Sequence, residues 1–192
     1  MHLAPVTASA ASRRGAYGNF KRAVLVLLAL DTALYVWRGT PGEAVDTLAW
    51  FTLLVLFYWE TQAGARTMHA VPPVAIRIAR LLAGVAVTAT AIAYTREHAW
   101  LDAANSWLWI AVVTLLELEV RYPEQVERHR GRFSAVAATL YGTLTLMPLA
   151  WLAQGQWLAA YDALLWLIAF ATIEIDVLSA RDSRGSDDGA LR

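Results

Sequence analysis

Six stretches of mostly apolar residues, each about as long as a bilayer is thick, constrain this chain more than any other feature. They lie at approximately 21–37, 44–61, 78–95, 101–120, 133–153 and 157–178. A hydrocarbon core of roughly 30 Å needs about 20 apolar residues in a helix, because backbone amides in lipid must bond within their own segment. Asp31 interrupts the first stretch, whereas the fifth carries no charge. The pattern predicts an all-α fold: a polytopic integral membrane bundle of six transmembrane helices.

The composition excludes several other classes of protein. Hydrophobic residues make up 58% of the chain and charged residues 17%, against about 45–50% and about 25% in soluble domains. The 16 basic and 16 acidic residues cancel, so the charge does not favour nucleic-acid binding. The chain has no cysteine, its four histidines fall in tails or loops, and no HExxH, GxSxG or Walker motif occurs. We therefore expect no enzymatic activity, no cofactor and no metal site.

Lysine and arginine gather on one side of the expected membrane. All of the 16 except Arg38 and Arg96 lie near the two ends of the domain or near the connections after the second and fourth stretches. Short loops rich in these residues stay in the cytoplasm. The pattern predicts a multi-pass protein of the cell inner membrane with both termini cytoplasmic. We expect flexible tails at 1–19 and 181–192 around a transmembrane domain at 20–180.

An internal repeat relates the six stretches in pairs. A shift of 57 residues places Glu60 on Glu117 and Glu117 on Glu174 without a gap. The alternative is chance similarity, because membrane helices use few residue types. The repeat predicts three tandem helical hairpins arranged in a ring. These hairpins are expected at about 21–61, 78–120 and 133–178.

The repeated glutamates lie at the cytoplasmic ends of the second, fourth and sixth stretches. Glu60, Glu117 and Glu174 could point inward and form a proton or cation site, since clustered carboxylates repel one another and suit proton exchange. They could instead be interfacial charges paired with arginines, because Arg121 follows Glu117 by four residues on one helix. Binding to a partner protein is a third interpretation.

The structural interpretation extends to an ionic latch across each hairpin. A basic residue begins each odd stretch on the side where an acidic residue ends the even one, so opposite charges could close the hairpin. The latch candidates are Arg22, Arg80 and Arg132 on the odd stretches and Glu60, Glu119 and Asp176 on the even ones.

Asp31 is the charged residue deepest in an expected span. It lies about midway between Arg22 and Arg38, and its repeat equivalents are Thr88 and Thr145. A layer of one carboxyl and two hydroxyl groups could hold a proton, a cation or a water molecule inside the membrane. Alternatively, a protonated Asp31 hydrogen-bonds a neighbouring helix, or the first helix shifts so that Asp31 lies shallower.

Other polar and aromatic residues receive simpler interpretations. The first turns of the even stretches contain Asp46, Asn105 and Asp162. We expect these to have capping or interfacial roles, because such side chains favour helix N-termini. Four tryptophans lie deeper than the interfacial aromatic belt and are expected to pack between helices: Trp50, Trp107, Trp109 and Trp166.

Two functions from different classes fit these patterns. The first is a small channel or transporter for protons or cations, using Asp31, Thr88 and Thr145 in the membrane and the repeated glutamates at the cytoplasmic mouth. The second is a non-catalytic membrane subunit or assembly factor that docks a larger complex through an outward aromatic face such as Trp107 and Trp109. The expected partners are the lipid bilayer and either a membrane protein or a second copy of the chain.

Overall fold

The described part of the chain is all-helical, as predicted. The computed structural model describes residues 6–62 and 72–190, with side chains for 16–59, 72–119 and 121–173, and within these residues it contains seven helices and no strand. The helices are α1 (Val6–Arg38), α2 (Pro41–Gln62), α3 (Pro73–Arg96), α4 (Trp100–Arg121), α5 (Pro123–Arg128), α6 (Arg130–Ala153) and α7 (Trp157–Ala190). The six long helices coincide with the six apolar stretches.

The helix ends differ from the sequence prediction in two ways. Helix extends into both segments expected to be flexible tails, since α1 begins at Val6 and α7 continues to Ala190. The connection after the fourth stretch contains the separate short helix α5. Pro123 explains this break, because proline restricts the residue before it and has no amide hydrogen with which to continue α4.

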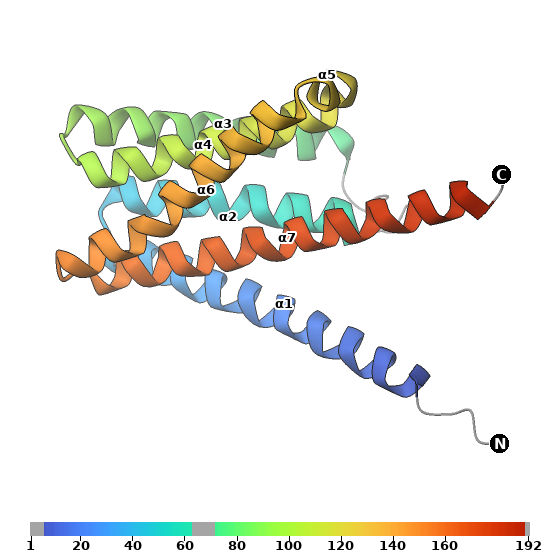
Figure 1. The fold of residues 1–192 in the computed structure, drawn as a ribbon. Helices are drawn as coiled ribbons and strands as arrows, with labels where there is room; N and C mark the ends of the chain where they lie inside the picture. The colour runs from blue at the N-terminus through green and yellow to red at the C-terminus, as the bar shows by residue number, and fades with distance from the viewer. Residues whose placement is uncertain (1–5, 63–71, 191–192) are drawn as a thin grey trace.

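The six long helices form a closed ring in chain order. Helix α1 packs on α2, α2 on α3, α3 on α4, α4 on α6, α6 on α7, and α7 returns to α1. The α1–α7 contact includes a hydrogen bond of 3.1 Å from the Tyr17 hydroxyl to the Thr172 carbonyl. Figure 1 shows the short connections α1–α2, α3–α4 and α6–α7 at one end of the bundle, here called the turn end, and both termini with α5 at the other, the terminal end.

Local sequence signals explain how the hairpins turn. Helix α2 begins with a reciprocal capping box: the Thr40 amide donates to Glu43 Oε2 at 2.7 Å, and the Glu43 amide donates to Thr40 Oγ1 at 3.3 Å. The α6–α7 turn depends on Gly155, whose φ of +76° other residues rarely adopt. These turns are two or three residues long, so each hairpin's helices emerge side by side.

Three helices are apolar and long enough to cross a membrane, fewer than the six predicted. They are Pro73–Arg96, Trp100–Glu119 and Arg130–Ala153 among the described residues. The described apolar part of α7, Trp157–Ile173, is shorter. In α1 and α2, charged residues such as Asp31 and Asp46 reduce the mean hydropathy of the helix.

The ring has an apolar core and an apolar outer surface. Buried residues from all six long helices meet in one cluster that includes Leu28, Leu54, Val87, Val112, Leu144 and Phe170. On the outside, Leu81, Leu82 and Val85 of α3 are about two-thirds exposed. A contiguous apolar exterior is a liability in water and matches a lipid environment, which agrees with a membrane protein.

The deep tryptophans divide between the core and the surface. Trp50, Trp109 and Trp166 are buried, which confirms the prediction for three of the four. Trp107 is 42% exposed and lies outside the core, but it contacts a neighbouring helix, because its indole hydrogen is donated to Thr95 Oγ1 of α3 at 3.2 Å. Trp107 and Trp109 therefore do not form one outward aromatic face, because residues two apart on a helix point in nearly opposite directions.

Candidate functional site

The glutamate cluster expected at the terminal end is represented by Glu117 alone. This side chain is exposed and forms an ion pair of 2.6 Å with Arg121 on its own helix. The side chains of Glu60 and Glu174 lie outside the described residues. What the structure describes at this position is thus an exposed ion pair within α4, the pairing with an arginine that the second interpretation above expects.

The latch residues lie mostly on the surface. The side chains of Arg22, Arg80 and Arg132 are exposed, and Glu119 is half-buried. The side chain of Asp176 lies outside the described residues, as does that of Glu60. The ionic latch therefore stays a prediction.

The predicted layer of Asp31, Thr88 and Thr145 is not brought together. Asp31 is buried, but both threonines are exposed and turn back onto their own helices. Thr88 donates to the Gly84 carbonyl at 2.9 Å, and Thr145 donates to the Gly142 carbonyl at 2.7 Å. The rotation of α3 is the reason, since Thr90 rather than Thr88 faces the interior.

The structure instead pairs Asp31 with Asp162. Asp31 is only 3% exposed, and neither of its carboxyl oxygens has a hydrogen-bond partner among the described residues; the same holds for Oδ1 of Asp162. The two carboxyl groups, from α1 and α7, are close enough to form a hydrogen bond with each other. A carboxylate is only an acceptor, so this bond needs a proton on one of the two groups. The pair is a place where one proton can be shared.

Further polar groups surround the pair. Tyr35 is buried on α1 and lies within electrostatic range of both Asp31 and Asp162. The hydroxyl of Thr32 is buried and has no hydrogen-bond partner among the described residues. Buried polar groups are normally satisfied by protein or by ordered water. This part of the ring therefore contains several buried polar atoms that have no hydrogen-bond partner among the described residues.

Two more aspartates extend the polar region toward the turn end. Asp46 of α2 accepts a hydrogen bond of 2.6 Å from the buried Thr90 hydroxyl of α3. Asp102 of α4 lies near the Trp151 indole and is within electrostatic range of Asp46. We call Asp31, Asp46, Asp102 and Asp162 the acidic layer.

The acidic layer lies close to the turn end. Counting residues from the nearest helix end, its members lie about 3 to 11 Å inside the helices at 1.5 Å per residue. Among the described residues, none of the four aspartates forms an ion pair with a lysine or arginine. The layer is thus a concentration of negative or protonated groups without compensating cations.

An aromatic cluster closes the ring next to the acidic layer. Trp50 follows Asp46 by one turn and Trp166 follows Asp162 by one turn, and these two indoles meet edge to face with centroids 6.3 Å apart. Phe170 packs on Trp166 at 6.3 Å and on Trp109 at 4.5 Å. This cluster, called the aromatic plug, fills the interior on the side of the acidic layer that faces the terminal end.

The chemistry open to the site is narrow. Within the described residues, no three His, Cys, Asp or Glu side chains are grouped so that they could hold a metal ion. No protein family model, no curated protein and no solved structure matches the chain. The distinctive feature of the site is the pair of facing carboxyl groups of Asp31 and Asp162.

Sequence reasoning gave several of these residues a different role. The sequence predicts capping or interfacial roles for Asp46 and Asp162, whereas in the structure Asp46 bonds to a neighbouring helix and Asp162 faces Asp31. Asn105 has a buried side-chain oxygen without a partner among the described residues. Asp102 was not singled out at all. The position of these residues along their helices is the signal in the sequence that could group them. Each of them lies within the first two turns of an even stretch, and these turns are all at one end of the bundle.

Proposed function

We propose that this chain is a small membrane translocator of protons and that the Asp31–Asp162 pair is its proton-binding group. The observation that carries the proposal is a pair of facing carboxyl groups, one of them on the buried Asp31, that forms no ion pair with a lysine or arginine among the described residues. Ionisable residues inside a membrane are costly, and they are typical of ion pathways and proton relays. Two facing carboxyl groups repel when both are ionised, and one shared proton removes that repulsion.

The rest of the acidic layer suits the entrance of such a pathway. Asp102 and Glu43 lie nearer the turn end than the pair, and Asp46 lies at about the depth of Asp162, so that acidic groups surround the approach to the pair. A polar mouth of one sign raises the local concentration of counter-ions. A proton is favoured over a metal cation because the described carboxylates do not converge as metal ligands.

The aromatic plug supports a pathway that is closed toward the terminal end. Protons need a chain of water or polar groups. The packed rings of Trp50, Trp109, Trp166 and Phe170 are mainly apolar, and the indoles of Trp50 and Trp166 are already engaged with Asp46 and Asp162 of the acidic layer. In this proposal, a proton enters from the turn end, and the plug must rearrange before the proton leaves on the other side. Such gating is typical of carriers that expose one site alternately to each side.

The proposal includes a topology. In this proposal all six long helices span the cell membrane. The membrane tolerates α1, α2 and α7 despite their charges because the charged side chains face the inside of the ring. The 57-residue repeat accounts for the three hairpins, and the arginine distribution places both termini in the cytoplasm. The turn end and its acidic layer then face outward. The proposal assigns no enzymatic activity and no cofactor.

The test is proton flux into liposomes that contain the purified protein, driven by a potassium diffusion potential and read with an internal pH dye. We expect flux in the natural protein, and a loss of about a hundredfold in Asp31→Asn and in Asp162→Asn, since an amide cannot exchange the proton. Glu117→Gln is the matched control, because this carboxylate is exposed and lies at the other end. It should retain full flux.

Two results would contradict the proposal. Undiminished flux in both aspartate variants would show that the pair is not on the pathway. No flux from folded natural protein would favour the alternative function, a non-catalytic subunit that docks a larger complex. The exposed indole of Trp107 is a candidate contact for that alternative, and crosslinking from this position in native membranes would identify the partner.

A further inference from the structure

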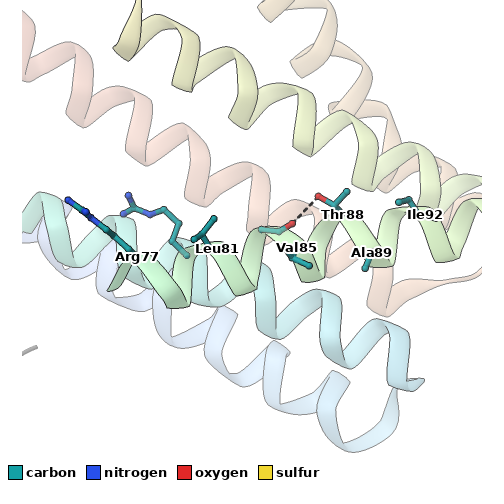
Figure 2. A pocket seen from close by; sticks show the side chains of 8 residues that line it. Arg77, Leu81, Val85, Thr88, Ala89 and Ile92 are labelled. Carbon is teal, nitrogen blue, oxygen red and sulfur yellow. Dashed lines mark hydrogen bonds between the residues drawn. The ribbon is translucent and has the colours of Figure 1, made fainter. Parts of the chain in front are cut away.

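The outward face of α3 carries a long groove, separate from the acidic layer. It has a volume of about 680 Å³ and runs along the helix from Arg77 to Ile92. Figure 2 shows Arg77 at one end, Ile92 at the other, and the apolar side chains of Leu81 and Val85 between them. The groove is therefore apolar along its length and basic at one end.

Two residues make the groove hollow. Gly84 has no side chain, and a Cβ atom at this position would have no neighbouring atom within 4 Å. Thr88, one turn further on, donates its hydroxyl to the Gly84 carbonyl at 2.9 Å, as Figure 2 shows. The hydroxyl is thus satisfied within the helix and does not require water or a polar ligand. The floor of the groove suits a hydrocarbon chain.

We propose that this groove binds an anionic phospholipid, with one acyl chain between Leu81 and Ile92 and the phosphate at Arg77 and Arg80. The apolar part from Leu81 to Ile92 covers 12 residues of helix, a rise of about 16 Å at 1.5 Å per residue, which matches one leaflet of a core of roughly 30 Å. The two arginines lie toward the terminal end, where a headgroup of that leaflet would be found. Basic pockets on transmembrane helices are typical sites for anionic headgroups.

Charge argues against a second copy of the chain as the occupant. Two copies in one membrane have the same orientation, so a two-fold contact through this face of α3 would bring both pairs of Arg77 and Arg80 together. Like charges at such a contact repel, whereas a phosphate neutralises them. The lipid proposal requires that the chain lies in a membrane but is independent of proton transport, because the groove lies on the outside of the ring.

The test is native mass spectrometry of the purified full chain with palmitoyl-oleoyl phosphatidylglycerol or phosphatidylcholine, which differ only in the headgroup. Each arginine should contribute roughly fivefold to the preference for phosphatidylglycerol, about 25-fold in all. Arg77→Gln combined with Arg80→Gln should remove most of this preference. Arg132→Gln is the control, since this arginine is exposed at the same end on α6.

A second pair of variants tests the groove itself. Gly84→Leu should fill the hollow and abolish retention of both lipids, while helix propensity favours its folding. Gly142→Leu on α6 is the matched control, because a Cβ there also meets nothing within 4 Å and the position is outside the groove. Equal retention of the two lipids by the natural protein, or full retention by Gly84→Leu, would overturn the proposal. A dimer that Gly84→Leu dissociates without loss of lipid would also overturn it, and would assign the groove to a second copy.

Discussion

The hydrogen bond between Thr90 and Asp46 gives a quantitative test of the acidic layer. The bond joins α3 to α2 at 2.6 Å, within the range of about 2.5–2.7 Å for a hydroxyl that donates to a carboxylate. Thr90→Val preserves the shape of the side chain and removes the donor. Charge-assisted bonds contribute about 1.5–3 kcal/mol in soluble proteins, but interhelical bonds in a membrane protein reach only about 1.7 kcal/mol. We expect a loss of about 1.5 kcal/mol, roughly tenfold in the unfolding equilibrium.

The surroundings of Thr90 allow a double-mutant cycle to isolate its bond with Asp46. Thr90 Oγ1 also lies 3.0 Å from the Val87 carbonyl, so in Asp46→Ala the hydroxyl can bond to its own helix and is not left unsatisfied. The coupling energy from the natural protein, the two single variants and the double variant then reports the interhelical bond alone. The assay is unfolding in mixed micelles with sodium dodecyl sulfate, followed by the fluorescence of the nine tryptophans and by far-UV circular dichroism.

Thr172→Val is the matched control for this cycle. Thr172 is similarly buried, but its hydroxyl donates only within α7, to the Ala169 carbonyl at 2.7 Å. The control should cost less than about 0.5 kcal/mol, because no interhelical bond is lost. The reasoning is refuted if the coupling energy of Thr90 and Asp46 falls below about 0.3 kcal/mol, the level of simple additivity, or if the control costs as much as Thr90→Val.

Two further predictions use the same unfolding assay. Leu28→Ala should lose about 2 kcal/mol, near the low end for a buried leucine because lipid does not drive burial, while Leu30→Ala on the exposed face of α1 should change little; equal effects would place the core of the ring elsewhere. Gly155→Ala should cost about 1–2 kcal/mol because of its positive φ, whereas Gly142→Ala within α6 should be neutral or stabilising by up to about 1 kcal/mol; a harmless Gly155→Ala would contradict the left-handed turn.

Much of the fold could be predicted from the sequence. The length of the apolar stretches set the six long helices, and the polar residues between them set the hairpin turns to within a few residues. The pairing of helices within each hairpin follows from the short connections, since consecutive helices joined by two or three residues must be neighbours. Pro123 and Gly155 lie where a helix breaks or turns, and the physical reason can be stated for each.

The composition of the site could not be predicted, because it depends on the rotation of each helix about its axis. In a soluble protein, the apolar face of a helix shows which side is buried. In this chain both sides are apolar, since apolar residues cover the outside of the ring as well as its core. The sequence therefore could not tell that Thr90 points inward and Thr88 outward, or that Trp109 is buried and Trp107 exposed.

The candidate site shows the same division. By itself, the sequence determined that Asp31 is an acidic residue inside an apolar helix. This makes Asp31 a candidate functional residue whichever helices lie next to it. Only the tertiary structure placed it beside Asp162, 131 residues away in the chain, because the closure of the ring brings α7 back to α1. Such a contact depends on the packing of all six long helices, and no local pattern in the chain records it.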